Sequence, residues 1–198
     1  MQHMAHSAEQ AQGQRLEADT REPIGSRHGG AVCVRAVSSE DEEGLRRMFS
    51  RLSKKTIYER FHMPYPRVPG WALASFTRAD EQAASLVAVV GDEIAGHAIC
   101  VRSDSGREAE FALVVEDRWQ SQGVGKRLLS ELAERARRRG VETFTGEVLG
   151  ENRRVLGLLG AVFAEVDYLL KDGVYHVRVP LRMLKPAANP SRKIRSAA

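Results

Sequence analysis

The sequence predicts a mixed α/β (α+β) domain, in which one sheet carries helices on both of its faces. Strand-like segments, in which every second residue is apolar, alternate with segments of helical period. Two pairs of the predicted strands are joined by short turns that contain glycine, as in hairpins. Hairpins next to strand–helix–strand units combine antiparallel and parallel neighbours in one sheet.

Length and composition suit one domain with a hydrophobic core, because the chain has 198 residues, 42% of them hydrophobic and 28% charged. Residues 1–30 have few aromatic residues and no regular period, so we expect a disordered N-terminal tail. Residues 185–198 are basic and contain Pro186 and Pro190, and we expect a second disordered tail there. The ordered domain is therefore expected at residues 31–184.

The first half of the domain is predicted to hold a strand, two helices and a hairpin. Acidic residues follow Ser38 and Ser39, a pattern typical of a capped helix start. Gly91-Asp92 lies between two apolar runs and indicates a tight turn. In chain order we expect a strand at 31–37, a helix from 38 or 39 to about 52, a helix at 54–61, and strands at 86–90 and 94–102.

The second half is predicted to hold two further strands, two helices and a closing hairpin. The helix at 123–139 has the clearest signal, because Gly140 follows its end and its apolar residues recur at helical spacing. That apolar stripe consists of Val124, Leu128, Leu129, Leu132, Ala133 and Ala136. The other elements are strands at 108–115 and 142–149, a helix from 152 to about 159, and hairpin strands at 163–170 and 174–181 around Asp172-Gly173.

The strand predicted at 108–115 has two different faces, because successive side chains of a strand point to opposite sides of the sheet. An apolar face carries Ala109, Phe111, Leu113 and Val115, and the other face carries Glu108, Glu110, Ala112 and Val114. Glu110 therefore lies on the more polar face, shortly before the loop that joins this strand to the long helix.

That loop, at residues 120–126, predicts a phosphate-binding site. It places the start of a strong helix directly after a strand end, with Gly123 and Gly125 at the turn. The first N–H groups of a helix have no partner within the helix, and they attract anions such as phosphate. Glycine suits such a loop, because a side chain would hold the phosphate away from the backbone.

Two common phosphate loops do not fit these residues. A dinucleotide fingerprint requires a third glycine where this sequence has Leu128, and its strand should open the fold rather than follow a hairpin. A nucleoside-triphosphate loop requires Ser or Thr after Gly125-Lys126, where this sequence has Arg127, and a glycine at the position of Gln120.

A third pattern, Gln/Arg-x-x-Gly-x-Gly/Ala, matches Gln120 to Gly125 in full. The segment resembles the acetyl-CoA loop of the GCN5-related N-acetyltransferases (GNAT family), and the order of elements over residues 32–181 matches the fold of that family. Glu151-Asn152 looks like the family's second cofactor element. The resemblance implies a mostly antiparallel central sheet with a splayed strand pair and helices on both faces.

The resemblance also implies acetyl-CoA as co-substrate and names the residues that would bind it. Pantetheine is expected along the backbone of Leu113, Val114 and Val115, and the pyrophosphate at the loop that begins with Gln120. Asn152 is either a cofactor contact or a helix N-cap, a position that asparagine favours. The loop residues whose N–H groups are expected to bind pyrophosphate are Ser121, Gln122, Gly123, Val124, Gly125 and Lys126.

Two segments, residues 52–61 and 109–117, resemble the bacterial protein-lysine acetyltransferases related to Pat. Glu110 matches the glutamate that serves as general base in that branch, and Glu108 is its nearest competitor. The N–H of Val115 is expected to bind the oxyanion by family analogy. Many relatives use a tyrosine as general acid seven residues after the asparagine, where this sequence has Leu159.

The acceptor is expected to be a protein lysine, with a small-molecule amine as the alternative within the class. A non-catalytic acyl-CoA sensor and a nucleic-acid-binding protein are the rivals from other classes. The basic run Arg137 to Arg139 and the basic tail favour a solvated surface over nucleic acid.

Compartment and metal content are predicted from what the sequence lacks. No apolar run approaches the ~20 residues of a membrane span, and no signal sequence is visible, so we expect a cytoplasmic protein without membrane contact. Cys33 and Cys100 form no Cys-x-x-Cys motif, and no metal site is expected.

Overall fold

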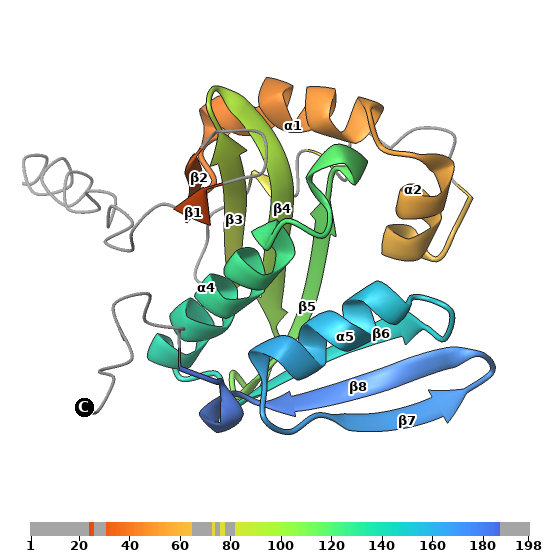
Figure 1. The fold of residues 1–198 in the computed structure, drawn as a ribbon. Coiled ribbons are helices and arrows are strands. Elements are labelled where there is room, and N and C mark those ends of the chain that lie inside the picture. The colour runs from red at the N-terminus through yellow and green to blue at the C-terminus, as the bar shows by residue number, and fades with distance from the viewer. Residues whose placement is uncertain (1–23, 26–30, 65–72, 74–75, 78–81, 187–198) are drawn as a thin grey trace, which may run out of the picture.

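The computed structural model describes residues 24–25, 31–64, 73, 76–77 and 82–186. One sheet of eight strands runs through them in the order β1-β2-β3-β4-β5-β6-β8-β7 (Figure 1). Its strands are β1 (Ile24–Gly25), β2 (Ala31–Ala36), β3 (Ala83–Val90), β4 (Glu93–Arg102), β5 (Glu108–Val115), β6 (Thr143–Leu149), β7 (Asp167–Lys171) and β8 (Val174–Pro180).

Neighbouring strands pair antiparallel with one exception, the parallel pair of β5 and β6. Two-residue turns, Gly91-Asp92 and Asp172-Gly173, close the hairpins β3–β4 and β7–β8. Both residues of the second turn have positive φ, 50° for Asp172 and 81° for Gly173, as a type I′ turn requires.

The parallel pair of β5 and β6 is short, because only Glu108, Glu110 and the residue between them pair with residues 143–145 of β6. Beyond Glu110 the two strands diverge, and β6 turns toward β8 instead. Figure 1 shows the resulting fork between β5 and β6. Gly146 allows the close approach at its apex, because a Cβ there would lie 3.1 Å from the Phe111 ring and 3.2 Å from the Phe111 carbonyl oxygen.

Helices cover both faces of the sheet and enclose two clusters of buried side chains. On one face α4 (Val124–Arg138) and α5 (Arg153–Val162) pack over Phe111, Phe144 and Val177. On the other face α1 (Glu42–Ser50) and α2 (Lys54–Phe61) pack over Val87, Ile99 and Val114. The two faces of β5 thus contribute to different clusters, as the alternation of its side chains predicted.

The order of elements predicted from sequence is confirmed, with differences at some boundaries. The helix expected to end near Leu159 continues to Val162, because Leu159 and Val162 both face the core at helical spacing. As a consequence the first strand of the closing hairpin starts at Asp167 rather than at Phe163, which is itself buried in the core. Ile24 and Gly25, within the predicted N-terminal tail, pair with β2. Most of both predicted tails lies outside the described residues.

None of the described helices is both long enough and apolar enough to span a membrane. In the same part of the chain, no group of three or more His, Cys, Asp or Glu side chains could hold a metal ion.

Candidate active site

The second half of β5 directs part of its backbone into the fork. The N–H of Glu116 donates to the carbonyl oxygen of Ala95, near the start of β4, at 2.9 Å. Because N–H and C=O groups of successive strand residues point to opposite sides, Val114 also faces β4, whereas Leu113 and Val115 face the fork. The strand on that side of β5 is β6, but β6 has diverged from β5 before Leu113 and Val115 are reached. The fork is therefore lined by backbone groups that can pair with an extended ligand.

The N-terminus of α4 opens at the same fork, behind a loop with an unusual backbone. Gly123 is its N-cap with φ 86° and provides no capping side chain, and Ser121 also has a positive φ of 60°. The N–H groups of the first helical turn consequently have no partner within the helix. Gly125 brings this turn close to β5 and α5, since a Cβ there would lie 3.4 Å from Leu158 and 3.6 Å from Val115.

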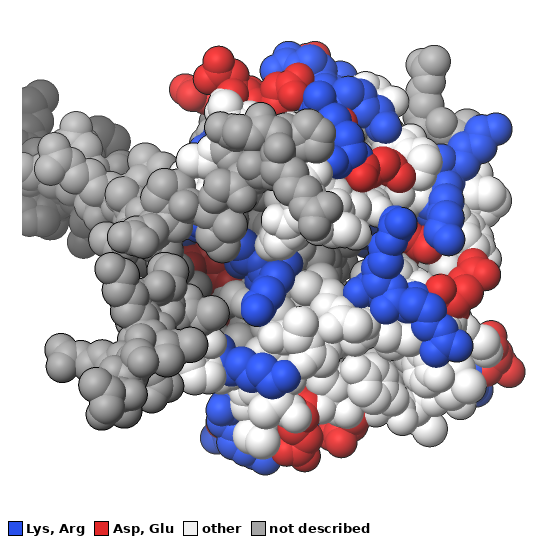
Figure 2. All heavy atoms as spheres, viewed as in Figure 1, with Lys and Arg blue, Asp and Glu red and all other residues white. Residues whose placement is uncertain are grey.

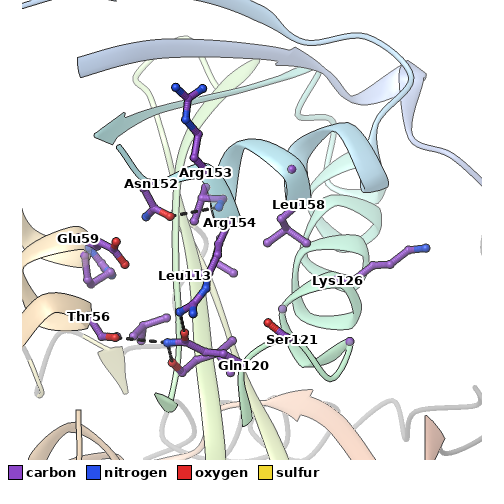
Figure 3. Close-up of a pocket in the computed structure, with 17 residues that line it drawn as sticks. Thr56, Glu59, Leu113, Gln120, Ser121, Lys126, Asn152, Arg153, Arg154 and Leu158 are labelled. Atoms are coloured by element: carbon purple, nitrogen blue, oxygen red, sulfur yellow. Dashed lines mark hydrogen bonds between the residues drawn. The ribbon is translucent and has the colours of Figure 1, made fainter. Parts of the chain in front are cut away.

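These elements enclose a cleft of about 390 Å³ between α2, β5, the start of α4 and the start of α5 (Figure 3). Among the described side chains that line it are four cations, Arg60, Lys126, Arg153 and Arg154, and one carboxylate, Glu59. Figure 2 shows basic side chains near the start of α5, next to the mainly uncharged surface of that helix. The other lining residues are Thr56, Leu113, Val114, Val115, Gln120, Ser121, Gly123, Gly125, Asn152, Val155, Gly157 and Leu158.

Gln120 connects three of the elements around the cleft. Its side-chain amide donates to the carbonyl oxygen of Val115 at 3.0 Å and to the Thr56 hydroxyl at 3.3 Å. Its amide oxygen accepts a hydrogen bond from Arg154 of α5, whose side chain turns toward it in Figure 3. The bond to Val115 independently places that carbonyl group on the fork side of β5.

Asp117 fastens α2 to the loop after β5. Its carboxylate accepts hydrogen bonds from the Ser53 N–H at 2.9 Å, from the Ser53 hydroxyl at 2.7 Å and from the Thr56 hydroxyl at 2.8 Å. Burial acts to raise the pKa of Asp117, but these hydrogen bonds outweigh it and hold the pKa below its usual value. The α2 wall of the cleft is thereby fixed at its first turn.

His97 lies behind the cleft, fully buried in β4 and paired in register with Val114. The Ser85 hydroxyl donates to the carbonyl oxygen of Phe76, so the Nε2–H of His97 donates to Ser85 Oγ at 2.8 Å. Burial, together with the charge of Arg60, lowers the pKa of His97 to about 3, so the ring stays neutral. Cys100, three residues on, faces the opposite cluster, which excludes a cysteine–histidine pair.

Comparison with known proteins agrees with this geometry. The sequence model of the acetyltransferase (GNAT) family matches residues 47–161, which include α2, the fork and the starts of α4 and α5. The chain belongs to the GNAT family.

Similarity extends to individual relatives. The chain is 31% identical over 153 residues to the acetyltransferase Pat of Mycolicibacterium smegmatis, an alignment that covers 73% of this chain and 45% of that protein. The chain thus spans less than half the length of this curated relative. The GNAT domain of S. lividans PAT superposes with a TM-score of 0.73 at 29% identity, covering 80% of this chain and 96% of that domain.

A more distant neighbour shows the fold alone. The acetyltransferase YncA of Salmonella typhimurium, solved with its cofactor acetyl-CoA, superposes with a TM-score of 0.61 at 19% identity, covering 82% of this chain and 99% of that one.

The residues of the cleft fit acetyl-CoA, the co-substrate of the GNAT family. The backbone groups of Leu113 and Val115 face the fork as partners for an amide-bearing chain such as pantetheine. The open N-terminus of α4 and the neighbouring cations suit the phosphates. Lys126 extends away from Arg154 in Figure 3, so the two cations lie on opposite sides of the loop.

Most of the predicted cofactor residues line the cleft, with two exceptions. Val124 is buried in the core, and the Gln122 side chain donates to the Arg118 carbonyl oxygen at 2.6 Å. Either could contribute only its backbone N–H, as the sequence analysis proposed. Asn152 is confirmed as the N-cap of α5, accepting from the Val155 N–H at 3.2 Å, and it also lines the cleft.

Glu110 does not line the cleft but stands at the apex of the fork, as the last residue of β5 that pairs with β6. It is exposed, and no hydrogen bond or ion pair joins it to another described residue. Its competitor Glu108 is engaged with Arg178 at 2.5 Å, and Glu116, on the same side of the chain, is engaged with Arg51 at 2.8 Å. Burial lowers the pKa of the nearby Arg60 to about 10, and the charge of Glu110 acts in the opposite direction.

The position expected for a tyrosine acid lies outside the cleft. Leu159 is fully buried in the core, whereas its neighbour Leu158 lines the cleft. No tyrosine is among the described residues that line it. Tyr168 and Tyr175 contact each other on the β7–β8 hairpin, with ring centroids 5.8 Å apart.

The wall formed by α2 and the arginines at the start of α5 are parts of the cleft that were not predicted from the sequence. Glu59 and Arg60 lie three and four residues after Thr56 on α2, a spacing that places all three on one side of the helix. Arg153 and Arg154 directly follow Asn152 in the sequence. Two cations at a predicted helix start could have indicated a second anion-binding position.

Proposed function

We propose that the chain transfers the acetyl group of acetyl-CoA to a lysine side chain of a protein, with Glu110 as general base. The observation that carries the proposal is the position of Glu110, an exposed and unpaired carboxylate at the apex of the fork. The resemblance of residues 52–61 and 109–117 to bacterial protein-lysine acetyltransferases, and the similarity to Pat, support the acceptor class.

A base addresses the main obstacle of the reaction. Acetyl-CoA supplies an activated acyl carbon and a thiol leaving group. A lysine amine has a pKa near 10.4, so its deprotonation at pH 7 costs roughly 4 to 5 kcal/mol. Glu110, acting directly or through water, would accept that proton. The Val115 N–H faces the fork and would stabilise negative charge on the acyl oxygen. A thiol with pKa near 8.5 leaves without a dedicated acid, consistent with a cleft whose described lining has no tyrosine.

The test is CoA release from acetyl-CoA with three acceptors: a lysine-containing peptide, the same peptide with arginine in place of lysine, and n-butylamine. We expect release with the first peptide, acetyl-lysine in the product by mass spectrometry, and none with the arginine peptide. Turnover with n-butylamine alone would instead identify a small-molecule acetyltransferase. We also expect the reaction to occur in the cytoplasm.

A non-catalytic acyl-CoA sensor is the second candidate, favoured by the lack of a tyrosine among the described cleft residues. A sensor would bind acetyl-CoA and shift Tm without releasing CoA. At 100 times its Kd a ligand adds about 2.7 kcal/mol to stability, roughly 5 to 10 °C in Tm for a chain of this size. A Tm shift together with steady CoA release would exclude the sensor.

A further inference from the structure

The sheet has an open face beside Glu110, which we call the acceptor face. Phe144, Val148 and Val177 point into the core under α4 and α5, so the alternate residues of β6 and β8 point to the other side. There Glu147, Leu169 and Arg178 are exposed, whereas Thr145 and His176 are half-buried. The acceptor face consists of Thr145 and Glu147 on β6, His176 and Arg178 on β8, and Leu169 on β7.

This face continues the site of the proposed chemistry. Glu110 pairs with Thr145, and Glu147 is the next residue of β6 on the same face. Two residues along a strand span about 7 Å, so Glu147 lies within reach of a group that flanks an amine held at Glu110. An acceptor that extends from Glu110 along β6 would meet Glu147 on the same face of the sheet.

Glu147 is a carboxylate held between two imidazoles. His176 Nδ1 lies 3.3 Å from one of its oxygens, and His62 Nδ1 lies 3.8 Å from the other. His62 reaches β6 from the C-cap of α2, where its φ is 54°. The Glu147 side chain nevertheless remains 54% exposed, and within the described chain its ion-pair partners are these two histidines and no arginine or lysine. Glu147 can therefore accept a cation from a second molecule.

Leu169 adds an apolar contact farther from Glu110. It pairs with His176 across β7 and β8 and is 66% exposed, the highest value among the large hydrophobic side chains of the described residues. Glu147 and Leu169 are separated by β8, which places them about 10 Å apart across the sheet. A carboxylate and an exposed leucine at this separation suit an extended peptide better than one small amine.

We propose that the acceptor face docks the acceptor protein, with Glu147 binding a basic side chain next to the target lysine and Leu169 contacting an apolar one. The occupant follows from charge complementarity. Arg178 on this face is paired with Glu108, which leaves the exposed carboxylate of Glu147 beside that of Glu110. The inference rests on the proposed function and deepens it, since it names residues that select a protein substrate by its flanking sequence.

The test uses the full chain and two synthetic peptides, in which the target lysine is flanked by arginine or by glutamate, together with n-butylamine. In E147Q we expect the KM for the arginine-flanked peptide to rise about 3- to 5-fold, with kcat unchanged and no change for the glutamate-flanked peptide or n-butylamine. In L169N the KM of both peptides should rise about 3-fold, while n-butylamine is unaffected. The matched control is E142Q, which changes an exposed glutamate just before β6 and should behave as wild type.

The outcomes separate the two proposals. Acetylation of both peptides with wild-type KM by E147Q and L169N would overturn the docking face and leave the proposed function intact. Turnover of n-butylamine with neither peptide acetylated would overturn the protein-lysine function and the docking face with it. An equal rise in KM for n-butylamine in E147Q would show that Glu147 binds the reacting amine itself, which contradicts the proposed role.

Discussion

The two ends of β5 carry glutamates in opposite situations. Glu116, just past the C-terminal end, is almost fully buried and bonds Arg51 and Arg118. Glu110, six residues earlier on the same face, is exposed at the fork and has no ion pair with any described residue. A buried carboxylate with two guanidinium partners holds elements together, whereas an unpaired one beside a cleft is available for proton transfer.

Neither residue type nor strand face is enough to assign a role to these glutamates. Glu108, Glu110 and Glu116 fall on one side of the chain, and the alternation of side chains alone does not distinguish them. Their partners differ because α1, the β5–α4 loop and β8 bring arginines to Glu116 and Glu108 and none within ion-pair distance of Glu110. The following predictions test that difference.

The largest expected effect is on turnover. Glu110→Gln should lower kcat by ~10² or more with little change in acetyl-CoA affinity, because it removes the proposed base and leaves the cleft residues in place. Steady-state kinetics from pH 6 to 9, with Tm as a check of folding, measure this effect. Glu108→Gln is the matched control on the same face and should retain turnover. Equal losses in both variants would remove the distinction between the two carboxylates.

Glu116→Gln should affect stability instead. The change leaves Arg51 and Arg118 beside a buried group that has lost its charge, at a cost of about 2 to 3 kcal/mol. For a chain of this size that lowers Tm by roughly 4 to 12 °C. Chemical denaturation of the variant and of wild type gives the difference directly. A wild-type midpoint would mean that the buried ion pairs contribute nothing net.

His97, at the buried end of the site, should make stability depend on pH. Its pKa is about 3 in the folded chain, against about 6.5 when unfolded, so the unfolded state binds more protons between these values. The contribution of neutral His97 to the free energy of unfolding is fully present above pH 7. It falls as the pH drops, by about 2 kcal/mol from pH 7 to pH 5. Denaturation midpoints of wild type and His97→Gln at both pH values test this. An unchanged slope in the variant would refute the assignment to His97.

The smallest effect is expected at Asp117. Its pKa is lowered in the folded chain, so its contribution is present above the unfolded pKa and is lost as the pH falls through the folded pKa. Asp117→Asn should cost about 1 kcal/mol at pH 7, since it weakens the hydrogen bonds to Ser53 and Thr56. Tm values of the two proteins should converge in strong acid. A constant difference at all pH values would show that the carboxylate charge is irrelevant there.

Local pattern predicted much of the fold and of the cofactor side of the site. Alternation placed Phe111 and Val114 in different clusters, and the spacing of Gln120, Gly123 and Gly125 identified the start of α4. These features depend on residues close together in the sequence. The positions of Arg60 and Arg154 at the cleft could not be predicted in this way. They depend on how α2 and α5 pack against β5, and local sequence periodicity does not determine that packing. The length of α5 was underestimated for a similar reason, since Val162 is held helical by the core.

The short pairing of β5 with β6 has a consequence for amide hydrogen exchange. The N–H groups of Val114 and Glu116 point to β4, whereas those of Leu113 and Val115 point into the fork. Slow and fast exchange should therefore alternate along a strand that is otherwise part of the core. A bound pantetheine chain would act as the missing neighbour strand and slow the fast amides selectively. Exchange rates of individual amides along β5 should therefore report whether the donor substrate is bound.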